Sequence, residues 1–414
     1  MKQVIVIGGG VVGLTSAWWL LEAGFGVTLL ERAPGVGSAA SARNGGQLSY
    51  RYVAPLADAG VPLKALEWLF DKNGPLRFRP EADLRQWRWL ASFLGHCSAS
   101  INRKTTGRLL QLGELSRQAM AQLEAHVGLD DFAWRDAGKL VVYRSARTFA
   151  AAAARPDAGT VLSAAECVLR EPALAAAGNV LAGGIYNGGE AVADCHAFCQ
   201  VLAARLQAHP RFRGIVQADA HSLVGDGRRI VGVRTSTSNS AAMLHADAYV
   251  LAAGIQSRTL AQTAGIYLPL YPLKGYSLSA PIRSTDIAPE ISVTDFERKV
   301  LYARIGSQLR VAAMVDMVGE DTRLDPKRLA TLTRQVRETM PHAADYDNIV
   351  PWAGLRPATP GSAPIVGATG FDNLWLNVGH GPLGFTFACG TAAILADLMQ
   401  GKAAPMPMDG LSLR

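Results

Sequence analysis

Residues 3–31 read QVIVIGGGVVGLTSAWWLLEAGFGVTLLE. The pattern predicts an apolar strand, a glycine turn, a helix and a second strand, in the order 3–7, 8–10, 11–23 and 27–31. Gly8, Gly10 and Gly13 allow the backbone to turn tightly and to approach a pyrophosphate at the helix N-terminus. Glu31, which closes the second strand, can accept hydrogen bonds from ribose hydroxyls. This context predicts a dinucleotide-binding α/β domain and leaves FAD and NAD both open.

A membrane span is the alternative interpretation of the same segment. Residues 4–21 carry no charge, are about long enough to cross a bilayer, and follow Met1-Lys2 as the core of a signal peptide would. Four glycines, however, would each cost a helix about 1 kcal/mol relative to alanine. We therefore expect a strand, a turn and a helix here, and no other membrane span in the chain.

Composition sets wide limits on the function. The chain has 414 residues, enough for two or three domains, and its 49% hydrophobic and 18% charged residues exclude a disordered protein. Its net charge of +7 favours anionic partners: amino-acid carboxylates, nucleic acid or anionic lipid. Five cysteines are too few for a disulfide framework, which favours a reducing, cytoplasmic location. Cys195, His196 and Cys199 form at most a partial ligand set, so we expect no metal site.

Two later segments favour FAD over NAD. Residues 41–47 (SARNGGQ) follow the second strand and offer consecutive backbone N–H groups. Residues 249–254 (YVLAAG) end an apolar strand in small residues, against which a ligand can pack closely. Nucleotide contacts spread this far along the chain suit FAD better than a short nicotinamide domain.

The C-terminal region carries the candidate substrate residues. Residues 352–360 (WAGLRPATP) include Arg356, whose planar guanidinium suits a carboxylate, although a structural ion pair explains it equally well. Residues 377–386 (NVGHGPLGFT) lead into a final helix, whose N-terminus can stabilise negative charge on a reduced flavin. His380 can touch flavin or substrate there, or simply occupy a turn.

The rest of the chain reads as further helices and strands. Helix is expected over 63–127, where apolar residues recur at Leu84, Trp87, Ala91 and Leu94, and over 194–207. Strands are expected at 140–143, 230–235, 248–252, 300–302, 309–313 and 374–378, with the second and third forming a meander around the polar loop 236–240.

One helical region mixes basic and aromatic residues between Arg77 and Arg108. They are Arg85, Arg88, Arg103, Lys104, Trp87, Trp89 and Phe93. Such a region can rest on an anionic membrane surface. A solvated face over a buried apolar stripe is the alternative.

The chain resembles the bacterial D-amino-acid dehydrogenase small subunit, within the D-amino-acid oxidase and glycine oxidase group of flavoproteins. The resemblance lies in residues 8–14 (GGGVVGL), 48–70, 271–277 (YPLKGYS), 352–367 and 373–381 (NLWLNVGHG), and it covers nearly the whole chain. It implies an α/β fold: a discontinuous Rossmann-like FAD-binding domain with an α+β substrate domain built on an antiparallel sheet. We expect the FAD-binding domain at 1–80, 151–265 and 336–414, and the substrate domain at 81–150 and 266–335.

The resemblance also implies roles for individual residues. The expected contacts of noncovalent FAD are Gly8, Gly10, Val11, Val12, Gly13, Glu31, Arg32, Ser41, Ala42, Arg43, Asn44, Gly45, Gly46, Gln47, Leu48, Ala220, Ala253, Gly254, Gly354, Gly379, His380, Gly381, Pro382, Leu383, Gly384, Phe385 and Thr386. The expected catalytic or substrate residues are Arg356 for the carboxylate, with Tyr276, Tyr302, His380, Tyr50 and Tyr52. The last two lie where relatives would have a Pro-Gly after Ser49, so the substrate range is in doubt.

The implied function is the oxidative deamination of D-amino acids to 2-oxo acids and ammonia, by hydride transfer from Cα to flavin N5. The expected electron acceptor is a respiratory quinone or another acceptor than oxygen. The enzyme is expected in the cytoplasm, with peripheral contact to the inner face of the cytoplasmic membrane as a further possibility. The alternatives are oxidation of glycine, sarcosine or a cyclic imino acid such as proline or hydroxyproline, and a nicotinamide dehydrogenase. An RNA-binding flavoprotein is disfavoured, because no aromatic–basic RNA motif is found.

Overall fold

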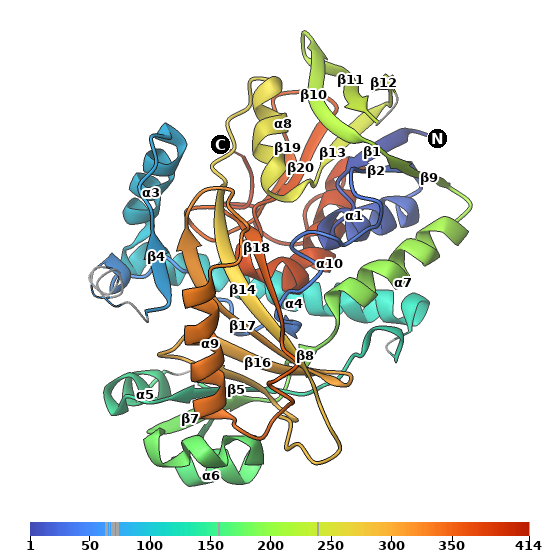
Figure 1. The fold of residues 1–414 in the computed structure, drawn as a ribbon. Helices are drawn as coiled ribbons and strands as arrows, with labels where there is room; N and C mark the ends of the chain where they lie inside the picture. The colour runs from blue at the N-terminus through green and yellow to red at the C-terminus, as the bar shows by residue number, and fades with distance from the viewer. Residues whose placement is uncertain are drawn as a thin grey trace.

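The computed structural model describes residues 1–413, except 63, 64, 66, 68–70, 72, 73, 129, 156, 157, 238 and 239. The start of the expected helix at 63, part of the resembling stretch 48–70 and the centre of the loop 236–240 lie outside the described residues. The molecule is a mixed α/β structure built around two large sheets (Figure 1).

The first sheet has the order β19-β20-β13-β1-β2-β9, and its neighbouring strands are parallel except β19 and β20. Its strands are β1 (Gln3–Ile7), β2 (Gly26–Glu31), β9 (Phe212–Gln217), β13 (Ala248–Leu251), β19 (Ile365–Ala368) and β20 (Leu374–Val378). β1 lies between β2 and β13 and is apolar from Val4 to Ile7, because both of its faces are covered. The expected strand–turn–helix–strand at the N-terminus is confirmed.

Both faces of the first sheet pack against other elements. Val4 and Val6 face a core formed with α1 (Val11–Glu22), α4 (Ala99–Val127), α7 (Cys195–Ala208) and α10 (Gly384–Met399). Ile5 and Ile7 face a core formed with α8 (Ser257–Thr263) and the small antiparallel sheet of β10 (Asp219–Asp226), β11 (Arg229–Ser236) and β12 (Ala241–Leu244). The alternation along β1 therefore separates two cores.

The second sheet has the order β18-β14-β17-β16-β15-β5-β7-β6, with β4 beside β17. It is antiparallel except where β5 meets β15 and β4 meets β17. Its strands are β4 (Leu76–Phe78), β5 (Lys139–Tyr143), β6 (Thr160–Leu162), β7 (Gly183–Asn187), β14 (Tyr271–Pro281), β15 (Ser292–Asp295), β16 (Val300–Ile305), β17 (Gln308–Met317) and β18 (Val350–Ala358). One face packs on α9 (Pro326–Thr339), and the other meets the loop 41–46 of the first domain.

The remaining elements are short or peripheral. They are β3 (Gln47–Leu48), β8 (Ala191–Val192), α3 (Leu84–His96), α5 (Ala146–Ala153), α6 (Ala164–Arg170), η1 (Asp130–Phe132), η2 (Pro172–Val180), η3 (Gly254–Gln256) and η4 (Gly381–Leu383). β3 and β8 form a two-stranded sheet between the two domains.

Three expectations need correction. The stretch expected to be helical up to residue 127 is not one helix. The short strand β4 precedes α3, and Cys97 and Ser98 separate α3 from α4. The hydroxyl of Ser98 caps the N-terminus of α4. The strands at 230–235 and 248–252 form no meander: β11 pairs with β10 and β12, whereas β13 joins the first sheet. The domain boundaries also differ, since 160–187 and 350–358 supply strands to the second sheet, and α4 packs on the first domain.

Within the described residues, one helix is long and apolar enough to span a membrane, at Gly381–Met399. The sequence interpretation missed this candidate. Its most apolar window is 61% buried, as in a core helix, and it packs on α1 and α4. Residues 4–21, the segment first considered, form β1, the turn and most of α1.

Candidate active site

The glycine turn after β1 leaves no room for side chains. Gly8 has φ +114°, and a Cβ there would lie 2.5 Å from the Ala252 carbonyl oxygen. A Cβ on Gly13 would lie 1.8 Å from the Gly8 carbonyl oxygen. The following helix begins with no acidic residue in its first turn, and its N-cap Gly10 offers no side chain. Ser41 Oγ accepts from Val11 N at 3.1 Å. The cradle and the helix N-terminus together fit a pyrophosphate.

Glu31 fixes the turn from the side. Its Oε2 accepts from Gly9 N at 2.6 Å, and its Oε1 accepts from Ala33 N at 2.7 Å. Each carboxylate oxygen retains capacity for a further donor, so a ribose hydroxyl can still be bound. The predicted contacts Ala220 and Ala253 follow the strands β9 and β13, which pair with β2 and β1 respectively. Both residues therefore lie near the same edge of the sheet as Glu31.

The loop 41–48 joins the two domains. Asn44 Oδ1 accepts from Gly46 N at 2.8 Å, which fixes the turn within the loop. Arg310 of β17 donates through Nη1 to the Asn44 carbonyl at 3.0 Å. Just after the loop, Ser49 N donates to Thr386 Oγ1 of α10 at 3.1 Å. The loop is thereby held between the second sheet and the N-terminus of α10.

A second helix N-terminus lies close to the first. α10 has no acidic residue in its first turn and no side-chain cap, and it packs along α1. Thr15 of α1 donates through Oγ1 to the Ala388 carbonyl at 3.1 Å. Two positive helix ends, a glycine cradle and a loop of backbone donors fit a long dianionic cofactor such as FAD, with its diphosphate at α1 and its flavin towards α10.

His380 is an anchor within the fold. Its side chain is buried, and burial lowers its pKa to about 3, so the ring is neutral. Nε2 lies 3.0 Å from Thr391 Oγ1, and the Thr391 hydroxyl donates to the Phe387 carbonyl, which leaves His380 as the donor. The ring therefore faces α10. The expected catalytic role is corrected to a structural one.

Arg356 on β18 is the cation of the candidate substrate site. Its guanidinium lies over the backbone of Gly275, and Nη1 donates to the Met314 carbonyl at 2.9 Å. That carbonyl is available because β17 bulges at Met314, which has φ +65°. No carboxylate of the described residues forms an ion pair with Arg356, and burial lowers its pKa to about 10. A half-buried cation with no carboxylate paired to it among the described residues is suited to bind the carboxylate of a substrate.

Tyr276 and Tyr302 lie on the other face of the sheet. Both are fully buried in the core beneath α9, together with Leu332 and Val336. The Tyr276 hydroxyl donates to Asp316 Oδ2 at 3.1 Å. Because side chains alternate along a strand, Tyr276 points away from the face where Arg356 covers Gly275. The expectation that these two tyrosines line the substrate pocket is wrong.

Tyr50 and Tyr52 point in different directions. Tyr50 is buried in the first-domain core, with Leu109 and Leu112 of α4, so it lines no open site. Tyr52 is 38% exposed, and its ring centroid lies 4.6 Å from Lys139 Nζ. Of the two, only Tyr52 remains a candidate to contact a substrate.

The sequence interpretation missed Lys139 and Glu190. Lys139 Nζ donates to Gln47 Oε1 and, at 3.0 Å, to Ser49 Oγ. Glu190 Oε1 accepts from Arg51 N at 2.9 Å. Burial lowers the pKa of Lys139 to about 8 and raises that of Glu190. Lys139 and Glu190 together hold the segment 47–52 in place. In the sequence, the feature that could have identified Lys139 is a lysine at the start of an otherwise apolar strand.

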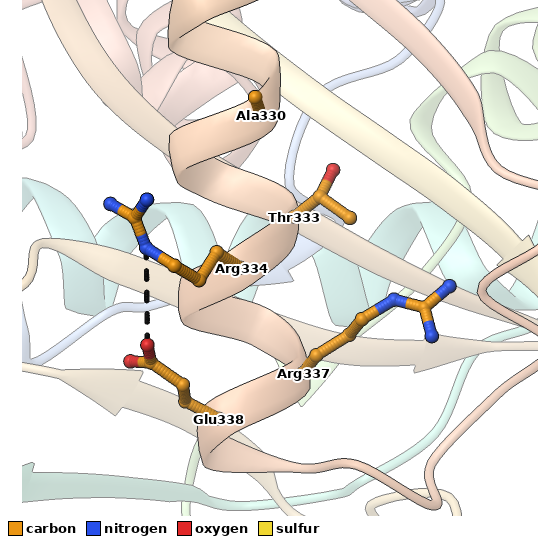
Figure 2. A pocket seen from close by; sticks show the side chains of 5 residues that line it. All are labelled: Ala330, Thr333, Arg334, Arg337 and Glu338. Atoms are coloured by element: carbon orange, nitrogen blue, oxygen red, sulfur yellow. Dashed lines mark ion pairs between the residues drawn. The ribbon is translucent and has the colours of Figure 1, made fainter.

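An open hollow of about 610 Å³ lies elsewhere, along α9 (Figure 2). It is lined by Ala330, Thr333, Arg334, Arg337 and Glu338, with an ion pair between Arg334 and Glu338. All five residues come from one helix on the face opposite Arg356. The hollow contains none of the features that fit a nucleotide.

Comparisons with known proteins show the family and the fold. Residues 3–398 match the family described as FAD dependent oxidoreductase. The chain is 49% identical over 413 residues to D-amino acid dehydrogenase 2 of Pseudomonas aeruginosa, covering 99% of this chain and 98% of that protein. It is 45% identical to D-amino acid dehydrogenase 2 of Ralstonia nicotianae, covering 97% of each. Its fold resembles that of glycine oxidase from Geobacillus kaustophilus, with a TM-score of 0.74, 19% identity and coverage of 100% and 99%.

Proposed function

Because the chain belongs to the FAD-dependent oxidoreductase family, we propose that it oxidises D-amino acids to 2-oxo acids and ammonia with noncovalent FAD. Relatives that share up to 49% of its sequence over nearly their full length are named D-amino acid dehydrogenases. The observation that carries the proposal is Arg356, a half-buried guanidinium with a backbone carbonyl as its partner and no carboxylate paired to it among the described residues. A substrate carboxylate completes this site.

Held by the glycine cradle at Gly8–Gly13 and by the N-terminus of α10, FAD would supply a hydride acceptor for the substrate Cα–H. The chain supplies position and charge. Arg356 holds the substrate carboxylate through its remaining N–H donors, and its own position is fixed by the Met314 carbonyl. The N-terminus of α10 favours negative charge where it develops.

No protein base is required when the substrate amine is neutral, since its lone pair drives the hydride from Cα. Among the predicted residues, His380 is bound to α10 and the tyrosines Tyr50, Tyr276 and Tyr302 are buried in cores. None of them is available as a base at Arg356. The imino acid product then takes up water and breaks down to the 2-oxo acid and ammonia.

An anaerobic titration of the purified enzyme tests the proposal. We expect an oxidised flavin spectrum that D-amino acids bleach and L-amino acids do not. A flavin that no amino acid bleaches would overturn the substrate assignment, and bleaching by glycine, sarcosine or a cyclic imino acid alone would establish the alternative substrate class. A protein that takes up no flavin when FAD is added would overturn the cofactor assignment.

We further propose that the electrons leave to a quinone rather than to dioxygen, and that the enzyme works in the cytoplasm in contact with the inner membrane surface. The names of the relatives support a dehydrogenase. The expected result is rapid D-amino-acid-dependent reduction of a soluble quinone analogue with little oxygen uptake. Rapid hydrogen peroxide formation in air would instead define an oxidase.

A further inference from the structure

Helix α3 exposes an apolar stripe. Leu84, Trp87 and Leu94 recur at helical spacing, and 76%, 46% and 50% of their surfaces are exposed. Trp89 and Gln86 on the opposite side of the helix are buried. The repeat that suggested a buried stripe in the sequence therefore faces outward. α3 also lies at the periphery of the molecule, beside β4 (Figure 1).

Exposed cations lie in and just after α3 along the chain. Arg88 lies within α3 and is exposed, and Arg103 and Lys104 are exposed on the first turns of α4, close to exposed Ile101. None of these three cations takes part in an ion pair within the described part of the chain, whereas Arg85 is held by Asp83. An apolar stripe with unpaired cations is the composition of a helix that lies in the interface of an anionic bilayer.

The inner side of α3 reaches the candidate active site. Trp89 Nε1 donates to the Ala358 carbonyl at 2.9 Å, and Ala358 forms a β-bridge with His380 at the start of η4. Arg356 lies two residues before Ala358 on β18. Trp89 therefore links α3 to the end of β18 that carries Arg356.

We infer that the outer face of α3, with the start of α4, is the docking surface for an anionic lipid bilayer. Leu84, Trp87 and Leu94 enter the apolar boundary, while Arg88, Arg103 and Lys104 contact the lipid phosphates. The inference deepens the proposed function and rests on it in one respect: docking through α3 brings the site close to a membrane-dissolved acceptor. The binding itself needs no substrate and no turnover.

Sedimentation of the FAD-loaded enzyme with vesicles tests the inference. We expect binding to phosphatidylglycerol-rich vesicles at low salt, release by high salt, and little binding to phosphatidylcholine alone. Leu84→Ser with Leu94→Ser should weaken binding at least about 10-fold. Arg88→Gln with Arg103→Gln and Lys104→Gln should weaken it roughly 100-fold. Matched controls are Leu169→Ser, at an 83% exposed site on α6, and Arg213→Gln with Arg234→Gln, both exposed on the first domain.

Each outcome decides between the inference and its alternatives. If the α3 variants bind vesicles like the wild type, or if the controls lose as much binding, α3 is not the docking surface. If the wild type binds neither vesicle type, the inference fails, and a protein partner becomes the candidate occupant. Bleaching of the flavin by D-amino acids is measured in the same samples without vesicles. It should be unchanged in every variant, so failure of the proposed function is seen separately.

Discussion

The guanidinium of Arg356 lies directly over the α-carbon of Gly275: a Cβ at position 275 would lie 2.2 Å from Nη2. The two residues sit on neighbouring strands, β18 and β14, where Gly275 pairs with Gly354. The absence of a side chain at 275 thus creates the space in which the cation rests. The bulge at Met314 supplies the carbonyl that orients it.

Gly275→Ala is expected to displace Arg356 and raise the KM for D-amino acids about 10-fold, which is the cost of losing one charge-assisted hydrogen bond. The flavin spectrum should stay unchanged, since Gly275 lies on the second sheet, away from the glycine cradle. Steady-state kinetics with a quinone analogue measure the effect. Gly370→Ala, at a position with no neighbour within 4 Å, is the control. An unchanged KM in Gly275→Ala would show that Arg356 does not hold the substrate.

Replacing Arg356 itself should have a larger effect. Arg356→Ala is expected to raise the KM for D-amino acids by roughly 100-fold, and Arg356→Lys to restore only part of it, because an ammonium lacks the planar fork. Equal KM values for Arg356→Ala and the wild type would remove Arg356 from this role.

Glu31→Gln tests the nucleotide end of the site. Both carboxylate oxygens accept backbone N–H groups, and an amide can replace only one of them. We expect at least about 10-fold weaker FAD binding, measured by fluorescence titration of the apoprotein. Glu22→Gln at the end of α1 is the control for a lost negative charge. FAD affinity equal to that of the control would mean that Glu31 is dispensable.

Tyr276→Phe distinguishes the core from the site. The hydroxyl bonds Asp316 in the core under α9, so its loss should cost about 1 kcal/mol of unfolding free energy in urea denaturation. The KM and kcat for D-amino acids should stay within about twofold of the wild type. A large change in KM without loss of stability would return Tyr276 to the substrate pocket.

The residues at the nucleotide end could be predicted from the sequence because local geometry alone constrains them. Gly13 packs against Gly8 within a single turn, and Glu31 of the adjacent strand accepts a hydrogen bond from Gly9 N. Arg356 could be singled out, but the absence of an ion-pair partner among the described carboxylates could not, since this depends on where the fold places each carboxylate. The N-terminal strand, helix and strand followed from apolar runs that leave few alternatives.

The errors share one physical cause. A sequence period of two or 3.6 residues shows which side chains share one face of a strand or helix. It does not show whether that face packs against the core, lines a site or is exposed to solvent. Tyr276 alternates with Gly275, and only the packing of α9 decides which of them faces the site. The stripe from Leu84 to Leu94 was equally compatible with a buried and an exposed face. Lys139 was missed because its partners, Gln47 and Glu190, are distant in sequence.

The buried ammonium of Lys139 predicts a pH dependence of stability. Its pKa is lowered to about 8 in the folded protein, from about 10.4 in an unfolded chain. Between these values the unfolded state binds more protons, so stability rises with pH. Below pH 8 Lys139 is protonated in both the folded and the unfolded state, so the folded protein bears the full cost of burying the ammonium. Relative to Lys139→Met, the wild type should therefore gain about 2 to 3 kcal/mol of unfolding free energy between pH 7.5 and 10.5.

Urea denaturation of both proteins across this range measures the difference, in which the titration of groups remote from Lys139 cancels. Burial raises the pKa of Glu190, and Lys139→Met removes the ammonium beside it, so this variant should also lose stability near neutral pH. Lys2→Met, at the exposed N-terminus, should run parallel to the wild type at every pH. A constant difference between the wild type and Lys139→Met would mean that Lys139 keeps its proton throughout, and that the segment 47–52 is held by a permanent charge.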